Sequence, residues 1–176
     1  MTIKSKMIFV LIGDDKTGKT TLQKLLIEKI SNHFYDRLPV NLVFPITHPE
    51  IKRKYRTVSF ANRSYQEKRD EYGTVEECFT NHFKDADIAF VSSHLNENQI
   101  NLIIKHSHAR FFNAFGVFFS NSIHFNQTVN SAISLLNWDE RLLIENPLVD
   151  SERFFSQLDL IAENIVDFII NRTSIS

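Results

Sequence analysis

The chain has 176 residues, of which 43% are hydrophobic and 23% charged, with a formal net charge of −1 and one cysteine. This length suits a single domain over residues 1–176, and the charge argues against a protein that coats nucleic acid through bulk charge. One cysteine excludes an internal disulfide, and no stretch approaches the ~18 apolar residues that cross a bilayer. We therefore expect a cytoplasmic protein with no membrane partner.

The first element is an unbroken apolar run over residues 7–12, which predicts a strand buried on both faces of a parallel sheet. The next eight residues match the phosphate-binding P-loop, G-x-x-x-x-G-K-T, at every fixed position: Gly13-Asp14-Asp15-Lys16-Thr17-Gly18-Lys19-Thr20. Apolar residues from Leu22 to Ile30 then recur at helical spacing. Strand, glycine loop and helix is the order that this mode of phosphate binding requires, because loop and helix N–H groups point at one anion.

This motif predicts a site for ATP or another nucleoside triphosphate with Mg²⁺. Lys19 would supply a positive charge for the β- and γ-phosphates, and the Thr20 hydroxyl would ligate Mg²⁺. The competing interpretation is an ordinary strand-to-helix turn with a coincidental Lys and Thr. The predicted nucleotide-binding residues are Gly13, Asp14, Lys16, Thr17, Gly18, Lys19, Thr20 and Thr21.

Strands and helices alternate along the rest of the chain. Further strands are predicted over residues 38–44, 87–92, 113–119 and 141–145, and further helices over 74–84, 96–108, 126–137 and 150–170. Residues 50–73 are polar and show no clean periodicity. The expected fold is an α/β three-layer sandwich of P-loop NTPase type, with a mostly parallel five-stranded sheet.

Ligands of such sheets bind beyond the carboxyl ends of the strands. This rule places several segments around one cleft: the P-loop, the segment after Phe44, the turns Ser92-Ser93-His94 and Ser120-Asn121-Ser122, and Glu145-Asn146. His94 and Glu145 are candidates to face the ligand, although either could simply be a polar residue that ends a strand.

Seven cations lie between residues 52 and 69, with aromatic residues among them. They are Lys52, Arg53, Lys54, Arg56, Arg63, Lys68 and Arg69, and the aromatic residues are Tyr55, Phe60 and Tyr65. Three interpretations stay open: a solvated loop, a lid that closes over phosphates, or a small nucleic-acid contact with aromatic stacking.

The segment Gly13-Asp14-Asp15-Lys16-Thr17-Gly18-Lys19-Thr20-Thr21 resembles the P-loop of thymidylate kinases and related nucleoside and nucleotide kinases, which often read G-x-D-x-x-G-K-[ST]-T. The resemblance covers about residues 7–30. It implies that Asp15 faces the acceptor substrate, which makes Lys19 and Asp15 the candidate catalytic residues. It also implies the Mg²⁺ and phosphate roles of Thr20 and Lys19.

Two features depart from that family. An Asp-Arg pair usually ends the third strand of those kinases, where this chain reads Val91-Ser92-Ser93-His94. An arginine-rich lid usually follows the fourth strand, but no Lys or Arg occurs between Arg110 and Arg141. The first hypothesis is an ATP-dependent kinase for a nucleoside, nucleotide or other small acceptor. The alternative, which both departures favour, is a nucleotide-binding regulatory or assembly module whose slow hydrolysis switches a protein partner.

Overall fold

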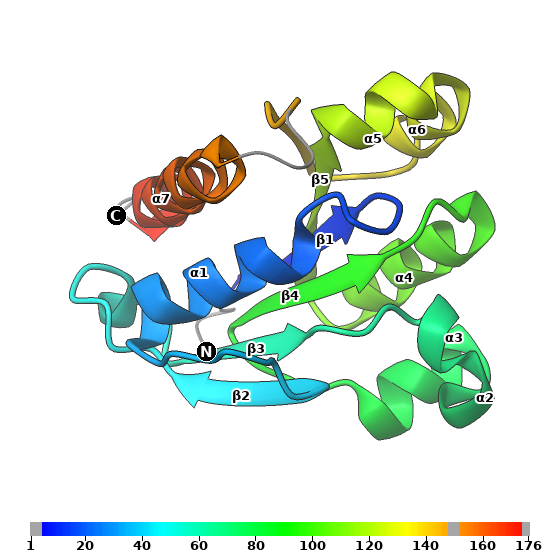
Figure 1. The fold of residues 1–176 in the computed structure, drawn as a ribbon. Coiled ribbons are helices and arrows are strands. Elements are labelled where there is room, and N and C mark those ends of the chain that lie inside the picture. Colours follow the sequence, from blue (N-terminus) through cyan, green and yellow to red (C-terminus); the bar gives the residue numbers. More distant parts are fainter. Residues whose placement is uncertain (1–4, 148–151, 174–176) are drawn as a thin grey trace.

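The computed structural model describes residues 5–147 and 152–173. Its centre is a six-stranded sheet with the order β2-β3-β4-β1-β5-β6 (Figure 1). The strands are β1 (Lys6–Ile12), β2 (Asn41–Pro45), β3 (Thr57–Ala61), β4 (Ile88–Ser93), β5 (Phe112–Phe119) and β6 (Glu140–Ile144). Neighbouring strands are parallel except β2 and β3, which pair antiparallel. The predicted α/β fold with a mostly parallel sheet is confirmed, and the count of five strands was wrong.

Helices cover both faces of this sheet. α1 (Lys19–Ser31) and α7 (Arg153–Thr173) lie together on one face, and α4 (Glu97–Ala109) covers the other (Figure 1). The shorter elements are η1 (Ile51–Arg53), η2 (Gln66–Lys68), α2 (Arg69–Tyr72), α3 (Val75–Glu77), the π-helix η3 (Cys78–His82), α5 (Ser120–Phe125) and α6 (Gln127–Ser134). None of the helices within the described ranges is long and apolar enough to cross a membrane.

The central strand β1 is buried on both faces, as its unbroken apolar sequence predicts. Phe9 points to the α1–α7 face, and its neighbours Ile8 and Val10 point to the α4 face. On the α1–α7 face, Phe9 stacks on Phe90 and Phe115 with ring centroids 4.9 and 5.0 Å apart. The three rings lie in register on the adjacent strands β4, β1 and β5, so their burial and stacking stabilise the centre of the sheet.

The sixth strand, β3, lies in the segment that showed no periodicity. Val58 and Phe60 are buried, but Ser59 between them is buried too, so the strand lacks an alternation of apolar and solvated residues. Because β2 returns antiparallel, its end at Pro45 pairs with Thr57 at the start of β3. The segment after Phe44 therefore lies at the amino ends of the parallel strands, away from the 13–20 loop at their carboxyl ends. Its predicted place at the cleft was wrong.

Several helix limits also differ from those expected. The helix over 74–84 is the short α3 followed by a π-helical turn, although the capping box between Thr74 and Glu77 is present. The helix over 126–137 ends at Ser134, and a separate helix, α5, precedes it. The closing helix begins at Arg153. The start expected at Asp150 falls outside the described residues.

Candidate functional site

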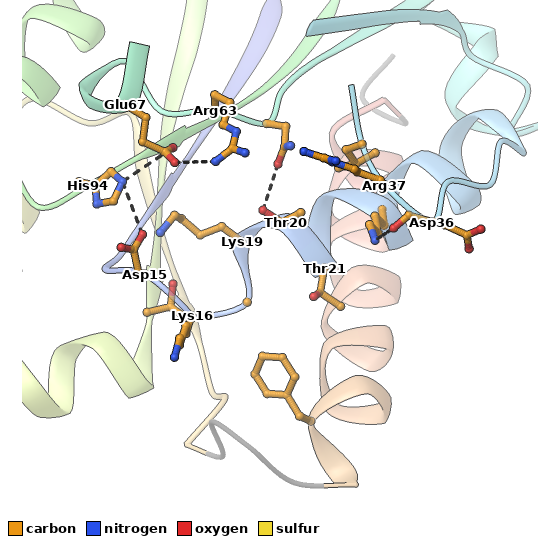
Figure 2. A pocket seen from close by; sticks show the side chains of 16 residues that line it. Asp15, Lys16, Lys19, Thr20, Thr21, Asp36, Arg37, Arg63, Glu67 and His94 are labelled. Atoms are coloured by element: carbon orange, nitrogen blue, oxygen red, sulfur yellow. Dashed lines mark hydrogen bonds and ion pairs between the residues drawn. The ribbon is translucent and has the colours of Figure 1, made fainter. Parts of the chain in front are cut away.

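A cleft of about 670 Å³ opens where β1 passes into α1, at the carboxyl ends of β1, β3 and β4. Figure 2 shows side chains from several segments pointing into it. Its lining residues are Asp15, Lys16, Thr17, Gly18, Lys19, Thr20, Thr21, Lys24, Asp36, Arg37, Leu38, Asn62, Arg63, Glu67, His94 and Phe154. The 13–20 loop forms the floor, so most of the residues predicted to bind nucleotide face one space.

The 13–20 loop turns through two left-handed backbone positions. Lys16 has φ 64° and Gly18 has φ 107°, and Gly18 is the N-cap residue directly before α1. A Cβ atom on Gly18 would stand 2.9 Å from Leu158 and 3.0 Å from Phe154 of α7. Glycine is needed here both for its backbone conformation and for the close approach of the closing helix.

The ammonium group of Lys19 lies folded over this loop. Its Nζ donates hydrogen bonds of 2.6 Å to the carbonyl oxygens of both Gly13 and Asp14. Burial lowers the pKa of Lys19 from its ordinary value, while the nearby carboxylates of Asp15, Asp14 and Glu67 act in the opposite direction. A partly desolvated cation at the centre of a loop is well placed to attract a phosphate group.

Asparagine side chains hold the loop from behind. The carbonyl oxygen of Thr17 accepts hydrogen bonds from the amides of Asn121, at 3.1 Å, and Asn146, at 2.9 Å. The Asp14 carboxylate accepts a hydrogen bond from the Asn126 amide. Two of the predicted nucleotide-binding residues, Gly13 and Asp14, do not line the cleft. The turns 120–122 and 145–146, which we expected at the cleft, therefore support the loop instead of facing a ligand.

Thr20 meets a residue that the sequence did not single out. Its hydroxyl donates a 3.0 Å hydrogen bond to the amide oxygen of Asn62, directly after β3. Gln23 fixes the ends of β3 and β4 by donating to the Ala61 carbonyl and the Ser92 hydroxyl. Mg²⁺ prefers oxygen ligands and usually completes its shell with water and substrate phosphates. Thr20 and Asn62 fit that ion, since both present neutral oxygen atoms to the cleft.

At one end of the cleft, three titratable groups gather. His94 Nε2 lies 3.8 Å from Asp15 Oδ1 and 3.8 Å from Glu67 Oε2 (Figure 2). The backbone N–H of His94 donates to Gln66 Oε1, which fixes the residue directly after β4. A carboxylate thus lies beside the end of the third parallel strand, although it comes from the separate helical turn η2.

Glu67 is held as a carboxylate by its own segment. Partial burial alone would raise the pKa of Glu67, but hydrogen bonds from Ser64 and Arg63 outweigh it and lower the pKa below its ordinary value. Ser64 donates through both its N–H and its hydroxyl, and Arg63 Nη1 donates to Oε1 at 2.9 Å. The group is therefore charged and oriented at neutral pH.

The other end of the cleft carries positive charge. Lys24 of α1 donates to the backbone oxygen of Asp36, and Arg37 follows in the connection between α1 and β2. The cleft is thus lined by cations from three parts of the chain: Lys16 and Lys19 of the 13–20 loop, Arg37 after α1, and Arg63 after β3.

The seven cations between residues 52 and 69 do not form one lid. Strand β3 divides them, so residues 52–56 lie at the amino end of β3 and the later residues follow its carboxyl end. At the amino end, the Arg56 N–H donates to Asp87 and Lys54 donates to the Arg172 carbonyl. Only Arg63 of the seven lines the cleft. Tyr55, Phe60 and Tyr65 are buried, so these aromatic rings are not available to stack on bases. The structure therefore does not bring the seven cations together on one surface, as a continuous lid or a nucleic-acid contact would require.

Sequence reasoning missed Arg37, Asn62 and Glu67. Asn62 could have been found from the carboxyl-end rule if β3 had been identified. Arg37 and Glu67 lie in irregular segments, where no periodic pattern indicates which way a side chain points. Glu145, the remaining candidate, does not line the cleft in the described part of the chain.

Comparison with known proteins adds little to this geometry. No family model matches the chain, and no curated protein sequence matches it significantly. Among solved structures, the crystal structure of a fungal RNA kinase is similar with a TM-score of 0.42 and 10% sequence identity, over 97% of this chain and 96% of that one. A likeness at this level supports no conclusion about activity.

Proposed function

We propose that the chain is a P-loop protein that binds ATP with Mg²⁺ and transfers the γ-phosphoryl group to a small acceptor of the nucleoside or nucleotide type. The observation that carries the proposal is the position of Lys19. Its ammonium lies at 2.6 Å from two carbonyl oxygens of the 13–20 loop, on the floor of the cleft. This ammonium can leave those carbonyls for a phosphate without any change in the fold.

In this proposal several residues of the cleft have a role. Loop N–H groups and the start of α1 would bind the phosphates, with Lys19 between the β- and γ-groups. Thr20, with Asn62 beside it, would hold Mg²⁺, which neutralises phosphate charge when it is bound. Arg63 and Lys16 would add positive charge near the transferred group, since charge stabilisation supplies most of the catalysis of phosphoryl transfer. Asp15 would face the acceptor.

The regulatory module remains the alternative, but its two supporting observations are weaker than they looked in the sequence. A carboxylate, Glu67, does lie beside the end of β4, and arginines do line the cleft, at positions 37 and 63. Both come from segments outside the family motifs. A small kinase therefore accounts for the content of the cleft better than a switch does.

The experiment that separates the two uses γ-labelled ATP, Mg²⁺ and a pool of nucleosides and nucleoside monophosphates. A kinase should place label on an acceptor, and Lys19→Ala should abolish this transfer. Lys105→Ala, an exposed change on α4, serves as the matched control. Release of labelled inorganic phosphate alone, at an equal rate with and without the pool, would favour the module.

A further inference from the structure

Two carboxylates lie at the end of the cleft around His94. Asp15 and Glu67 both approach His94 Nε2 at 3.8 Å, and the Asp15 side chain is 84% exposed. Arg63 pairs with Glu67 at 2.9 Å, which offsets part of the charge of both groups. The Asp15 carboxylate would repel an incoming phosphate group, whereas a neutral hydroxyl would meet no such repulsion.

The distances around His94 leave it room for a substrate contact. A separation of 3.8 Å is too long for a hydrogen bond, so neither carboxylate occupies Nε2 directly. The side chain is 27% exposed and lines the cleft with Lys19, the residue that would hold the γ-phosphate. An imidazole in this position can accept a hydrogen bond from a group that approaches that phosphate.

We propose that the acceptor is an alcohol and that His94 takes its proton, an inference that rests on the proposed kinase function. In this step the acceptor oxygen forms a bond to the γ-phosphorus. The bond from that phosphorus to the β–γ bridging oxygen breaks, and its electron pair leaves with ADP. The hydroxyl proton passes to the imidazole of His94. The products are a phosphate monoester, ADP and an imidazolium, which then returns its proton to water.

The charged groups around His94 suit this role. Asp15 from the 13–20 loop and Glu67 from η2 both lie 3.8 Å from Nε2, so their negative charge would stabilise the imidazolium that forms. Arg63 and Lys19 are the cations on the same side; the first is paired with Glu67, and the second would be paired with phosphate. His94 and Glu67 are 27% and 35% exposed, so water screens this pair less than it screens the exposed Asp15.

The test uses ³¹P NMR to identify the products formed from ATP and Mg²⁺ with either nucleosides or nucleoside monophosphates. The spectrum separates a phosphate monoester from a diphosphate anhydride. Water serves as a third acceptor in each sample, through release of inorganic phosphate. Wild-type protein should form monoesters. His94→Asn should lower transfer to alcohols and water by ~10²-fold or more while ATP affinity, measured by calorimetry, stays within about twofold. His124→Asn, an exposed change on α5, should have no effect.

The pH profile distinguishes proton transfer from a structural role. His94→Asn should change the shape of the pH–rate profile of the residual transfer, because a proton-accepting group is lost, whereas loss of a merely structural contact would lower the rate without changing that shape. New anhydride products without monoesters, or a variant that keeps both the rate and the shape of the profile, would overturn the role of His94 and the alcohol acceptor. Tight ATP binding by the wild-type protein without any phosphorylated nucleoside or nucleotide, whether or not inorganic phosphate is released, would instead overturn the proposed kinase function itself.

Discussion

The Thr20 hydroxyl donates a 3.0 Å hydrogen bond to the side-chain oxygen of Asn62. These two residues come from the start of α1 and the end of β3, which are separated in sequence by a helix and an antiparallel strand. Their meeting depends on Gln23, which ties α1 to the Ala61 carbonyl and to Ser92 at the ends of the two adjacent strands. Under the proposed function, Mg²⁺ would bind with ATP at this pair.

Thr20→Val removes the hydroxyl and keeps the shape of the side chain. We expect the Mg²⁺ concentration for half-maximal ATP binding to rise by ~10-fold or more, because a ligand of the ion is lost. ATP affinity without Mg²⁺ should change little. Fluorescence titration with a labelled ATP analogue measures both, with Thr128→Val on the exposed face of α6 as control. Unchanged Mg²⁺ dependence would remove Thr20 from the metal site.

Gly18→Ala should impair both the fold and the site. The new methyl group would require φ near 107° and would press on Leu158 and Phe154, so we expect a loss of about 1–3 kcal/mol in the free energy of unfolding. ATP binding should be lost as well. Gly73→Ala, where φ is 67°, gives a matched strained position away from the cleft. It should also lower the melting temperature but retain ATP binding, and equal loss of binding in both variants would contradict the assignment.

Tryptic cleavage should respond to ATP on only one side of β3. Arg63 lines the cleft, so nucleotide should slow cleavage after this residue. Arg53 precedes β3 and its side chain is 74% exposed, so cleavage after this residue should proceed at the same rate with and without ATP. Mass spectrometry of timed digests compares the two sites within one sample. Equal protection of both would indicate that the whole 50–73 segment closes as a unit.

Proton uptake should accompany ATP binding at alkaline pH. Burial lowers the pKa of Lys19 below its ordinary 10.5, so the unliganded ammonium loses its proton at a lower pH than a free lysine. Bound phosphates favour the charged form and raise the pKa again, so uptake should grow as the pH rises above neutral toward that value. Calorimetry in buffers of different ionisation enthalpy at pH 7 and pH 9 measures it. Lys19→Arg, whose guanidinium stays charged, should show no alkaline increase.

The site elements that proved predictable are those specified by local sequence. The run 7–12, the loop and the helix after it form one contiguous unit, so strand, turn and helix signals agree over neighbouring residues. Gly18 illustrates the reason, because a left-handed turn before a helix has few solutions other than glycine. The carboxyl-end rule also placed His94 at the cleft, since that rule depends only on strand direction, whereas Ser92 and Ser93 are buried residues of β4 and do not line it.

The features that the sequence did not predict depend on how distant segments pair in the fold. Whether β2 runs parallel or antiparallel to β3 decides at which end of the strands residues 52–56 lie, and no periodicity in the sequence encodes that choice. Glu67 reaches His94 only because Arg63 and Ser64 hold its carboxylate in a tight turn. The aromatic residues among the cations looked available for stacking, but burial of Tyr55 and Phe60 is a property of the assembled core. The single domain and the cytoplasmic location stay predictions.

Calorimetric titration with ATP and Mg²⁺ of the wild-type protein and Lys19→Ala tests the proposed triphosphate site most directly. Removal of a partly buried cation that would contact phosphate should cost about 2–5 kcal/mol of binding free energy, which is ~30-fold or more in Kd. The melting temperature should hold, because the hydrogen bonds that the Lys19 Nζ donates in the described part of the chain go to two carbonyls of its own loop. Lys105→Ala on α4 should bind as the wild-type protein does. Equal affinity of Lys19→Ala and wild-type protein would contradict a phosphate-binding role for the 13–20 loop.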